Sequence, residues 1–347
     1  MQDGGKPMNN WRTFCTRLRK HPAATGLFLA LLTLILAVLS LCVGAVEVTP
    51  AEVVRALLTN DPADVSARVV LYSRLPRTCG SLLAGAALAV SGVIIQTVLA
   101  NPLAAPHIIG VNAGAGLAVT ISCALAPMTA MRPLAAFAGA MVGVLLVLLF
   151  AETTGASRIT LVLAGVAISS IFSALIDAVT TIYPDALIGS TDFRMGGLAG
   201  VTMARLAPAA VLIGISLAAV FCLTGLLDVL ALGPETAQSL GLSVRPTRLL
   251  FLTLAAALSG AAVSFCGLVG FVGLLVPHAV RAVVGAESRP LIVCSALGGA
   301  ALMTLCDLVA RTVAAPFELP VGTVLSVVGG PFFLWLLVRQ RGGRTHD

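Results

Sequence analysis

Charged side chains are scarce in this sequence: Asp, Glu, Lys and Arg together account for 10% of its 347 residues. A soluble domain carries about 25% charged residues, because its surface is in contact with water. Hydrophobic residues make up 58% of the chain instead, and its mean hydropathy is +1.03. The scarcity of charge therefore excludes an ordinary soluble domain and indicates an integral membrane protein.

Alternation of polar and apolar residues, which marks a membrane β-barrel, is also lacking, because the apolar runs are continuous. Several uncharged runs reach the length of about 20 residues that a helix needs to cross a bilayer. They occupy residues 23–46, 78–131, 206–227 and 319–338. The first run is longer than the roughly 7–15-residue core of a signal peptide and leads into "VGAVEV" without a clear cleavage site, so we expect it to be retained.

The apolar segments predict an all-α fold: a polytopic transmembrane helical bundle of about ten spans. An even number of spans places both chain ends on one side, and both ends are basic, which favours the cytoplasm. We therefore expect a single transmembrane domain at 24–338 between two cytoplasmic tails, 1–23 and 339–347. The ten predicted segments are 24–46, 78–98, 108–127, 133–151, 159–182, 206–227, 247–267, 270–284, 290–313 and 320–338.

A short sequence pattern recurs in the two halves of the chain. The first copy is "ALAVSG" (87–92) followed by Pro106 and His107, and the second is "AALSG" (256–260) followed by Pro277 and His278. Five spans separate the copies, so the second enters the membrane in the opposite direction. Inverted repeats of this kind are common in transporters, and we expect one here.

Sequence signatures of catalysis and of metal binding are lacking as well. The chain has no HExxH, GxSxG or GxxxxGK[ST] motif, and its eight cysteines form no CxxC pair. His107 and His278 each follow a proline and suit the end of a span better than a ligand role. We therefore expect no enzyme active site, no metal site and no cofactor on this chain, so that any ATP would be bound by another subunit.

Two carboxylates lie within predicted spans, Asp177 and Asp307. Ionisable residues inside a membrane are functional candidates, so an ion-coupled secondary transporter is the alternative function. Arg311 follows Asp307 by four residues, however, which puts the two side chains on one helix face where an ion pair forms easily. Asp177 lies near the end of its segment, close to the membrane interface. These two residues make a poor proton relay.

A polar segment, "LGPETAQSLGLSVRP" (232–246), separates the sixth and seventh spans. Pro234 suits the first position of a helix, and Gly241 suits the position just after its end. A helix start and a helix stop only seven residues apart predict a short surface helix with Glu235 and Gln238 on its polar side. An ordinary connecting loop is the alternative.

Four long motifs resemble the permease subunit of ABC importers for iron chelates, haem and cobalamin, the FecCD-type family of type II importers. The resemblance extends from about residue 25 to the C-terminus and keeps the order of the motifs. They read "RLPRTCGSLLAGAALAVSGVIIQTVLANPLAAPHIIGVNAGAGLAV" (74–119), "LGPETAQSLGLSV" (232–244), "GLVGFVGLLVPHAVR" (267–281) and "DLVARTVAAPFELPVGTVLSVVGGPFFLWLL" (307–337).

The resemblance implies a transport subunit of the bacterial inner membrane that works by alternating access with several partners. These are a second permease copy, as a homodimer or a pseudo-dimer, two cytoplasmic ATPase subunits holding ATP and Mg, and a periplasmic or lipid-anchored binding protein. Membrane lipid is the remaining partner, and no nucleic acid is expected. The polar segment becomes the element that couples to the ATPase, through Gly233, Pro234, Glu235, Thr236, Gln238, Ser239, Leu240 and Gly241.

The resemblance also assigns roles to single residues. Asn101 and Leu103 match positions of a cytoplasmic gate. Arg74, Arg77 and Arg311 match outer-face arginines that dock the binding protein, and as exposed rim charges they would steer its association. The alternatives are snorkelling towards lipid headgroups and, for Arg311, the local pair with Asp307.

Arg194, in "DFRMGGLAG" (192–200), is a candidate for the outer mouth, where it would meet an anionic ligand or anchor a headgroup. The cargo predicted first is an iron–siderophore complex. Haem and cobalamin come next, and an oxyanion such as molybdate is more remote.

Overall fold

The computed structural model describes residues 22–44, 48–59, 64–125, 131–153 and 158–341. Within these ranges the chain is helical nearly throughout and has no strand, which confirms the predicted fold class. Both predicted tails fall largely outside the described residues. The elements are α2 (Pro22–Cys42), α3 (Pro50–Thr59), α4 (Val65–Val69), η1 (Val70–Arg74), α5 (Leu75–Val98), η2 (Pro106–Ile109), α6 (Val111–Leu125), α7 (Arg132–Thr153), α8 (Arg158–Ile182), α9 (Pro184–Met195), α10 (Met203–Cys222), α11 (Thr224–Ala231), α12 (Pro234–Ser239), α13 (Val244–Cys266), α14 (Val272–Val284), α15 (Ser288–Thr312) and α16 (Val321–Arg341).

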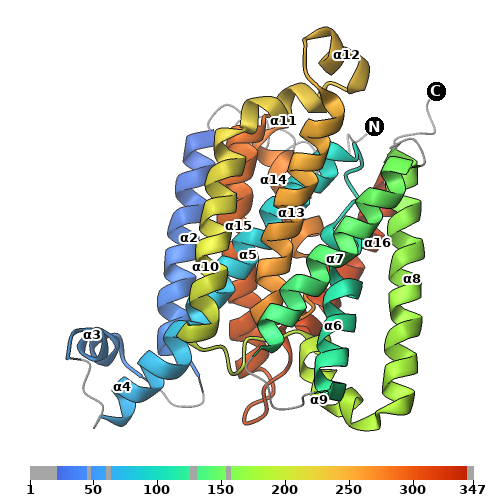
Figure 1. Cartoon of the computed structure of the whole chain (residues 1–347). Helices are drawn as coiled ribbons and strands as arrows, with labels where there is room; N and C mark the ends of the chain where they lie inside the picture. Colours follow the sequence, from blue (N-terminus) through green and yellow to red (C-terminus); the bar gives the residue numbers. More distant parts are fainter. Residues whose placement is uncertain (1–21, 45–47, 60–63, 126–130, 154–157, 342–347) are drawn as a thin grey trace, which may run out of the picture.

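The long helices run along one direction as a bundle (Figure 1). Seven of the described helices are long and apolar enough to cross a membrane, with α5 counted together with α4 and η1 as one span, and α6, α14 and α16 supply three shorter apolar helices. Each of the ten predicted segments corresponds to one of these helices. The chain is therefore a multi-pass membrane protein.

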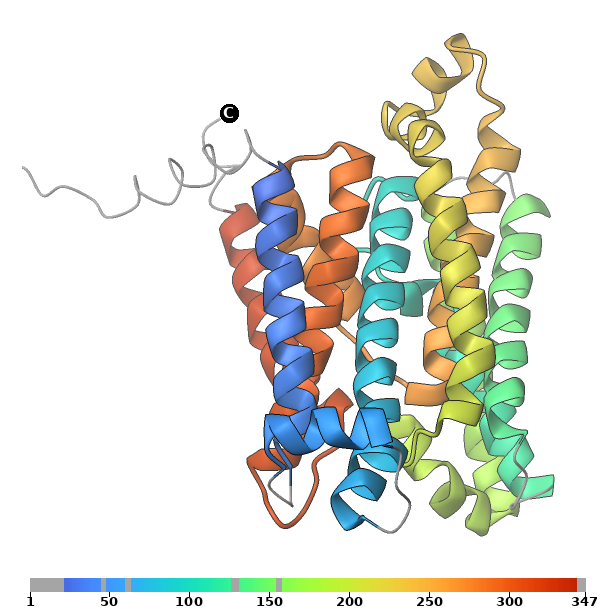
Figure 2. The ribbon, with the colours of Figure 1, turned by 90° about the vertical axis from the view of Figure 1, so that its left-hand side faces the viewer.

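The bundle has two distinguishable ends, which are named here after the short helices they carry. Helix α12 protrudes from one end, the α12 end, and α9 lies across the other, the α9 end, where α3 and α4 also lie (Figures 1 and 2). Helix α2 begins and α16 ends at the α12 end, so both ends of the described chain lie on one side of the bundle, as predicted.

Helix α5 lies at the centre and packs against α13, α14 and α15. Glycines let these backbones approach closely: a Cβ added at Gly85 would collide with the carbonyl of Gly299 on α15, and one at Gly92 with that of Gly273 on α14. In lipid, helices associate through such close packing because the hydrophobic effect does not drive them together. The small residues of α5 therefore position the helices around it.

The first parts of the two copies, 87–92 and 256–260, lie on α5 and α13, which run in opposite directions through the bundle (Figure 1). The two helices are joined there, because the Ser91 hydroxyl donates a hydrogen bond to the backbone carbonyl of Ala255 over 2.8 Å. This antiparallel course is the one that an inverted repeat requires.

Three connections at the α9 end are joined to one another through their backbones. Leu268 N–H donates to the carbonyl of Phe193, Gly197 N–H to that of Cys266, and Gly322 N–H to that of Gly196, over 2.8, 2.8 and 3.1 Å. Non-helical backbone at this depth needs partners within the protein. These bonds tie the end of α9 to the end of α13 and the start of α16.

Candidate coupling, gate and docking sites

The polar segment forms the predicted short helix, α12, which starts at Pro234. Its C-terminus closes as a Schellman motif: Gly241 N–H donates to the carbonyl of Gln238 and Leu242 N–H to that of Ala237, both over 2.9 Å. Gly241 adopts the left-handed conformation, with φ at 83°, that this motif requires. The local signals for the start and stop of this helix are therefore confirmed.

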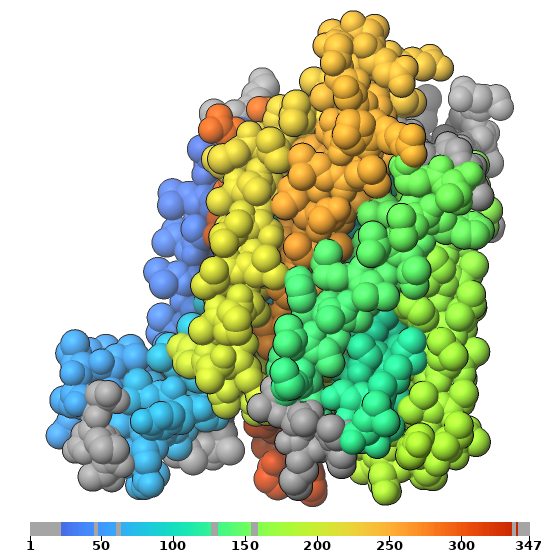
Figure 3. Space-filling model, in the orientation of Figure 1, coloured from blue at the N-terminus to red at the C-terminus, as the bar shows by residue number. Residues whose placement is uncertain are grey.

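Helix α12 turns only Ala237 into the protein. The side chains assigned to coupling point outward: Glu235, Thr236, Gln238 and Ser239 are exposed, and Leu240 is 62% exposed. The space-filling view shows α12 as a separate protrusion beyond the bundle (Figure 3). A short, rigid helix with polar side chains around one apolar side chain is suited to inserting into a cleft of another protein.

The two predicted gate residues lie where the chain leaves α5 at the same end. The Asn101 carboxamide oxygen accepts a hydrogen bond from Leu103 N–H over 2.9 Å, which holds both residues in a tight turn. Asn101 also lines a cavity of about 260 Å³ together with Ile159 and Leu163 of α8. The structure therefore places Asn101 beside α8, and the gating role stays a prediction.

Arg77 is buried at the α9 end, at 8% exposure, and is paired within the chain. Its Nε lies 2.9 and 3.1 Å from the two carboxylate oxygens of Asp307, and its Nη1 lies 2.8 Å from Oε2 of Glu318. Asp307 is fully buried and also faces Arg311 Nε at 3.7 Å, so the predicted local pair exists. This group of four residues is called the Asp307 cluster below.

The other two arginines are equally enclosed, with Arg74 at 4% and Arg311 at 6% exposure. Arg74 Nη1 donates to the carbonyls of Leu41 and Cys42 at the end of α2, over 2.8 and 2.6 Å. Arg311 Nη2 donates to the carbonyl and hydroxyl of Ser40 over 2.9 and 2.6 Å. The expectation that these arginines are exposed rim charges is therefore wrong for this chain. Their guanidinium groups are buried and make contacts between helices: those of Arg74 and Arg311 bind α2, and that of Arg77 binds α15. Their docking role stays a prediction.

A cavity of about 390 Å³ opens at the α9 end beside the Asp307 cluster. Its charged lining consists of Arg77, Arg132, Asp192, Arg205 and Glu318. Arg194 is exposed on α9 but is not among the lining residues, and its role as outer mouth stays a prediction. Arg132 and Arg205 were missed by the sequence analysis, although each lies at the start of a span at the same end as Arg77.

Helix α8 carries an unusual polar face. Ser169, Ser170, Ser173 and Asp177 line a cavity of about 620 Å³ together with His107. Asp177 and Ser173 are exposed on the described chain, although α8 is apolar enough to span a membrane. No group of three His, Cys, Asp or Glu side chains suited to a metal ion occurs among the described residues.

Residues 32–339 of the chain match the FecCD transport family. The chain is 40% identical to the Fe(3+) dicitrate transport system permease protein FecD of Escherichia coli strain K12, over 88% of this chain and 95% of that protein. It is 37% identical to the hemin transport system permease protein HmuU of Yersinia pestis, over 92% and 96%. A solved structure of a metal-chelate type ABC transporter in an inward-facing conformation superimposes with a TM-score of 0.79 at 31% identity, over 90% of this chain and 98% of that one.

The family match spans all four sequence motifs. This chain belongs to the FecCD transport family, whose members are ABC-transporter permease subunits with the ATPase in a separate subunit.

Proposed function

We propose that this chain is the membrane-spanning subunit of an importer that moves a metal chelate across the bacterial inner membrane. The observation that carries the coupling assignment is α12, a capped helix that projects its polar side chains away from the bundle. Relatives named for ferric dicitrate, hemin and ferric hydroxamate support an iron chelate as cargo. An iron–siderophore complex is proposed first, haem next and cobalamin after it.

The α12 end faces the cytoplasm in this proposal. By the predicted topology, 13 of the 21 Lys and Arg residues, those of both tails included, belong to this side, which agrees with the excess of basic residues in cytoplasmic loops. Two ATPase subunits would bind there, hold the ATP and Mg and hydrolyse the nucleotide, so this chain would carry out no hydrolysis itself. The binding protein would deliver its cargo at the α9 end.

A second copy of the chain covers the polar face of α8. An ionised carboxylate is costly in contact with lipid, so Asp177 is expected to face another subunit or a water-filled path. The cavity containing His107, Ser170 and Ser173 lies on this same face. A homodimer would enclose it as the pathway between the copies, with Asn101 and Leu103 closing its α12 end.

A secondary transporter is not favoured by these observations. Asp307 is paired with both Arg77 and Arg311, so its place inside the membrane is accounted for by ion pairs that join α5 and α15. The comparisons point to ABC-transporter subunits instead.

ATP-driven uptake into proteoliposomes tests this function. The vesicles would hold this chain with its candidate ATPase, and ferric siderophores, haem, cobalamin and molybdate would be offered outside, each with a candidate binding protein. Uptake of one chelate that requires both ATP and binding protein is expected. Uptake driven by an ion gradient without ATP would contradict the proposal.

The coupling role of α12 has a separate test. Replacing Glu235 and Gln238 together by Ala should leave the unfolding temperature unchanged, since exposed substitutions usually alter stability by less than about 0.5 kcal/mol. The same variant should lose co-purification with the ATPase and ATP-dependent uptake. An exposed control at the opposite end, Asp185→Ala, should retain both, and unchanged uptake by the double variant would exclude α12 as the coupling element.

A further inference from the structure

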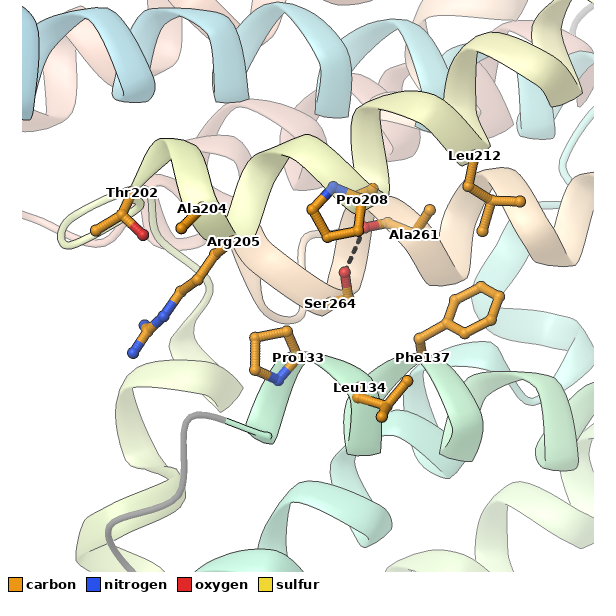
Figure 4. Close-up of a pocket in the computed structure, with 11 residues that line it drawn as sticks. Pro133, Leu134, Phe137, Thr202, Ala204, Arg205, Pro208, Leu212, Ala261 and Ser264 are labelled. Atoms are coloured by element: carbon orange, nitrogen blue, oxygen red, sulfur yellow. Dashed lines mark hydrogen bonds between the residues drawn. The ribbon is translucent and has the colours of Figure 1, made fainter.

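An apolar groove lies between α7 and α10 and has no part in the function described above (Figure 4). Its volume is about 460 Å³, within the range of about 300–1,000 Å³ that is usual for small-molecule sites. Leu134 and Phe137 come from α7, Pro208 and Leu212 from α10, and Ala261 and Ser264 of α13 form its floor. The space-filling view shows α13 between α10 and α7 on this side of the molecule (Figure 3).

The surface around the groove is the kind that faces lipid chains. Leu134 is 60% exposed and Val142 50% on α7, and Val211 and Ile215 are each 63% exposed on α10. Because both helices are apolar enough to span a membrane, these side chains are expected to contact acyl chains rather than water. The groove therefore opens towards the hydrocarbon interior.

The polar lining of the groove gathers at its α9 end. Figure 4 shows Thr202 and the guanidinium of Arg205 at one end of the groove, and Phe137 and Leu212 at the other. The Ser264 hydroxyl already donates to the carbonyl of Ala261 over 2.7 Å. Arg205 makes no ion pair with any described residue, so its charge is available to a ligand.

The neighbourhood of Arg205 is electropositive. The adjoining cavity at the α9 end shares Arg205 with the groove and is also lined by Arg132 and Asp192. Its other two charged residues, Arg77 and Glu318, are paired with each other. The lining thus holds three guanidinium groups and two carboxylates, a net positive charge that favours an anion.

We propose that this groove binds an anionic phospholipid, with one acyl chain between α7 and α10 and the phosphate at Arg205. An anionic headgroup complements the charge at the α9 end, and a hydrocarbon chain complements the apolar lining below it. A lipid reaches such a site laterally, because the exposed residues on both sides lie in the membrane. The proposal is independent of which cargo the protein carries.

Lipid titrations followed by native mass spectrometry of the purified full-length chain would test this proposal. The probes are dioleoyl phosphatidylglycerol, dioleoyl phosphatidylcholine and the soluble glycerol 3-phosphate. We expect phosphatidylglycerol to bind about tenfold more tightly than phosphatidylcholine, because both carry the phosphate but the choline cation of phosphatidylcholine is repelled by the guanidinium groups at the α9 end. Glycerol 3-phosphate should bind much more weakly than either lipid.

Three variants test the proposed headgroup contact at Arg205 and the proposed acyl-chain groove separately. Arg205→Gln should remove the preference for phosphatidylglycerol, and Arg205→Lys should retain it. Ala209→Phe, which places a ring in the groove, should weaken both lipids alike. Arg68→Gln, an exposed arginine at the same end but outside the groove, is the matched control and should bind like the original chain.

Three results would overturn the proposal. They are equal binding of the two lipids by the unaltered chain, a preference that survives Arg205→Gln, and binding of glycerol 3-phosphate as tight as that of phosphatidylglycerol. The last would assign Arg205 to a site for free phosphate esters. Unfolding temperatures in detergent without added lipid show whether each variant is folded.

Discussion

At the residue scale, the Asp307 cluster is the most consequential group of charges in the molecule. Arg77 of α5 and Arg311 of α15 face the fully buried carboxylate of Asp307, and Glu318, in the connection to α16, pairs with Arg77. Burying these charges is costly unless each is paired, so the loss of one partner leaves a charge without compensation. The cluster is thus a structural tie, whatever its part in docking.

Asp307→Ala should therefore destabilise the protein strongly, by about 3–5 kcal/mol, because it leaves buried Arg311 without a carboxylate and removes the buried partner of Arg77. Glu318→Ala should cost only about 0–1 kcal/mol, since the Glu318 side chain is 44% exposed. Equilibrium unfolding in detergent measures both. Similar values for the two variants would contradict the distinction between buried and exposed partners.

A second residue-scale feature is the capping box at the start of α3. The Glu52 carboxylate accepts hydrogen bonds from the backbone N–H and the hydroxyl of Thr49, over 2.7 and 2.8 Å. The backbone hydrogen bond, followed by the hydroxyl bond, lowers the pKa of Glu52. A lowered pKa stabilises the folded helix above the unfolded value of about 4.3.

This contribution should disappear as the pH falls through the lowered pKa of Glu52, because the protonated side chain no longer accepts both bonds. Amide hydrogen exchange in residues 50–59 should then show less protection in acid than at neutral pH. Glu52→Gln should remove most of the pH dependence. If exchange in α3 responds to pH equally in the variant, the capping box is not its cause.

At the element scale, local signals could be predicted and distant pairings could not. Pro234 and Gly241 define α12 through the conformation of their own backbones, and the sequence displays both. Arg77 and Asp307 are 230 residues apart, and nothing near either residue indicates the other. The short helix α12 could therefore be predicted from the sequence, whereas the burial and pairing of Arg77 could not.

Close helix packing gives a second test at this scale. Gly85→Ala should cost about 1–3 kcal/mol, since the new Cβ would overlap the carbonyl of Gly299 and push α15 from α5. Gly214→Ala on α10 meets open space and should be neutral or slightly stabilising. Equal unfolding free energies for the two variants would show that α5 and α15 do not need this close approach.

At the scale of the whole molecule, the order of the ten spans could be predicted from hydropathy, because each apolar run is bounded by polar residues, glycine or proline. Which spans pack against one another could not be predicted from hydropathy, because nearly all of them are apolar on every side. The cavity between α7 and α10 and the position of Asn101 beside α8 depend on that grouping. Both therefore required the structure.

The proposed dimer makes a prediction at this scale. In a background without native cysteines, Ser173→Cys on the polar face of α8 should form a disulfide between two copies on mild oxidation. Val211→Cys, 63% exposed on α10, should remain monomeric under the same conditions. Non-reducing electrophoresis of membranes distinguishes the cross-linked dimer from the monomer. Cross-linking at position 211 and not at 173 would contradict a dimer formed through α8.

Helix α12 has few contacts with the rest of the protein. Since it turns only one side chain into the protein and is capped by its own backbone, residues 233–241 form a surface segment that is separate from the core. Under the proposed coupling role, a chimaera carrying the corresponding segment of a relative would keep its membrane bundle while binding a different ATPase subunit. The proposed coupling role thus separates the choice of ATPase from the residues that build the bundle.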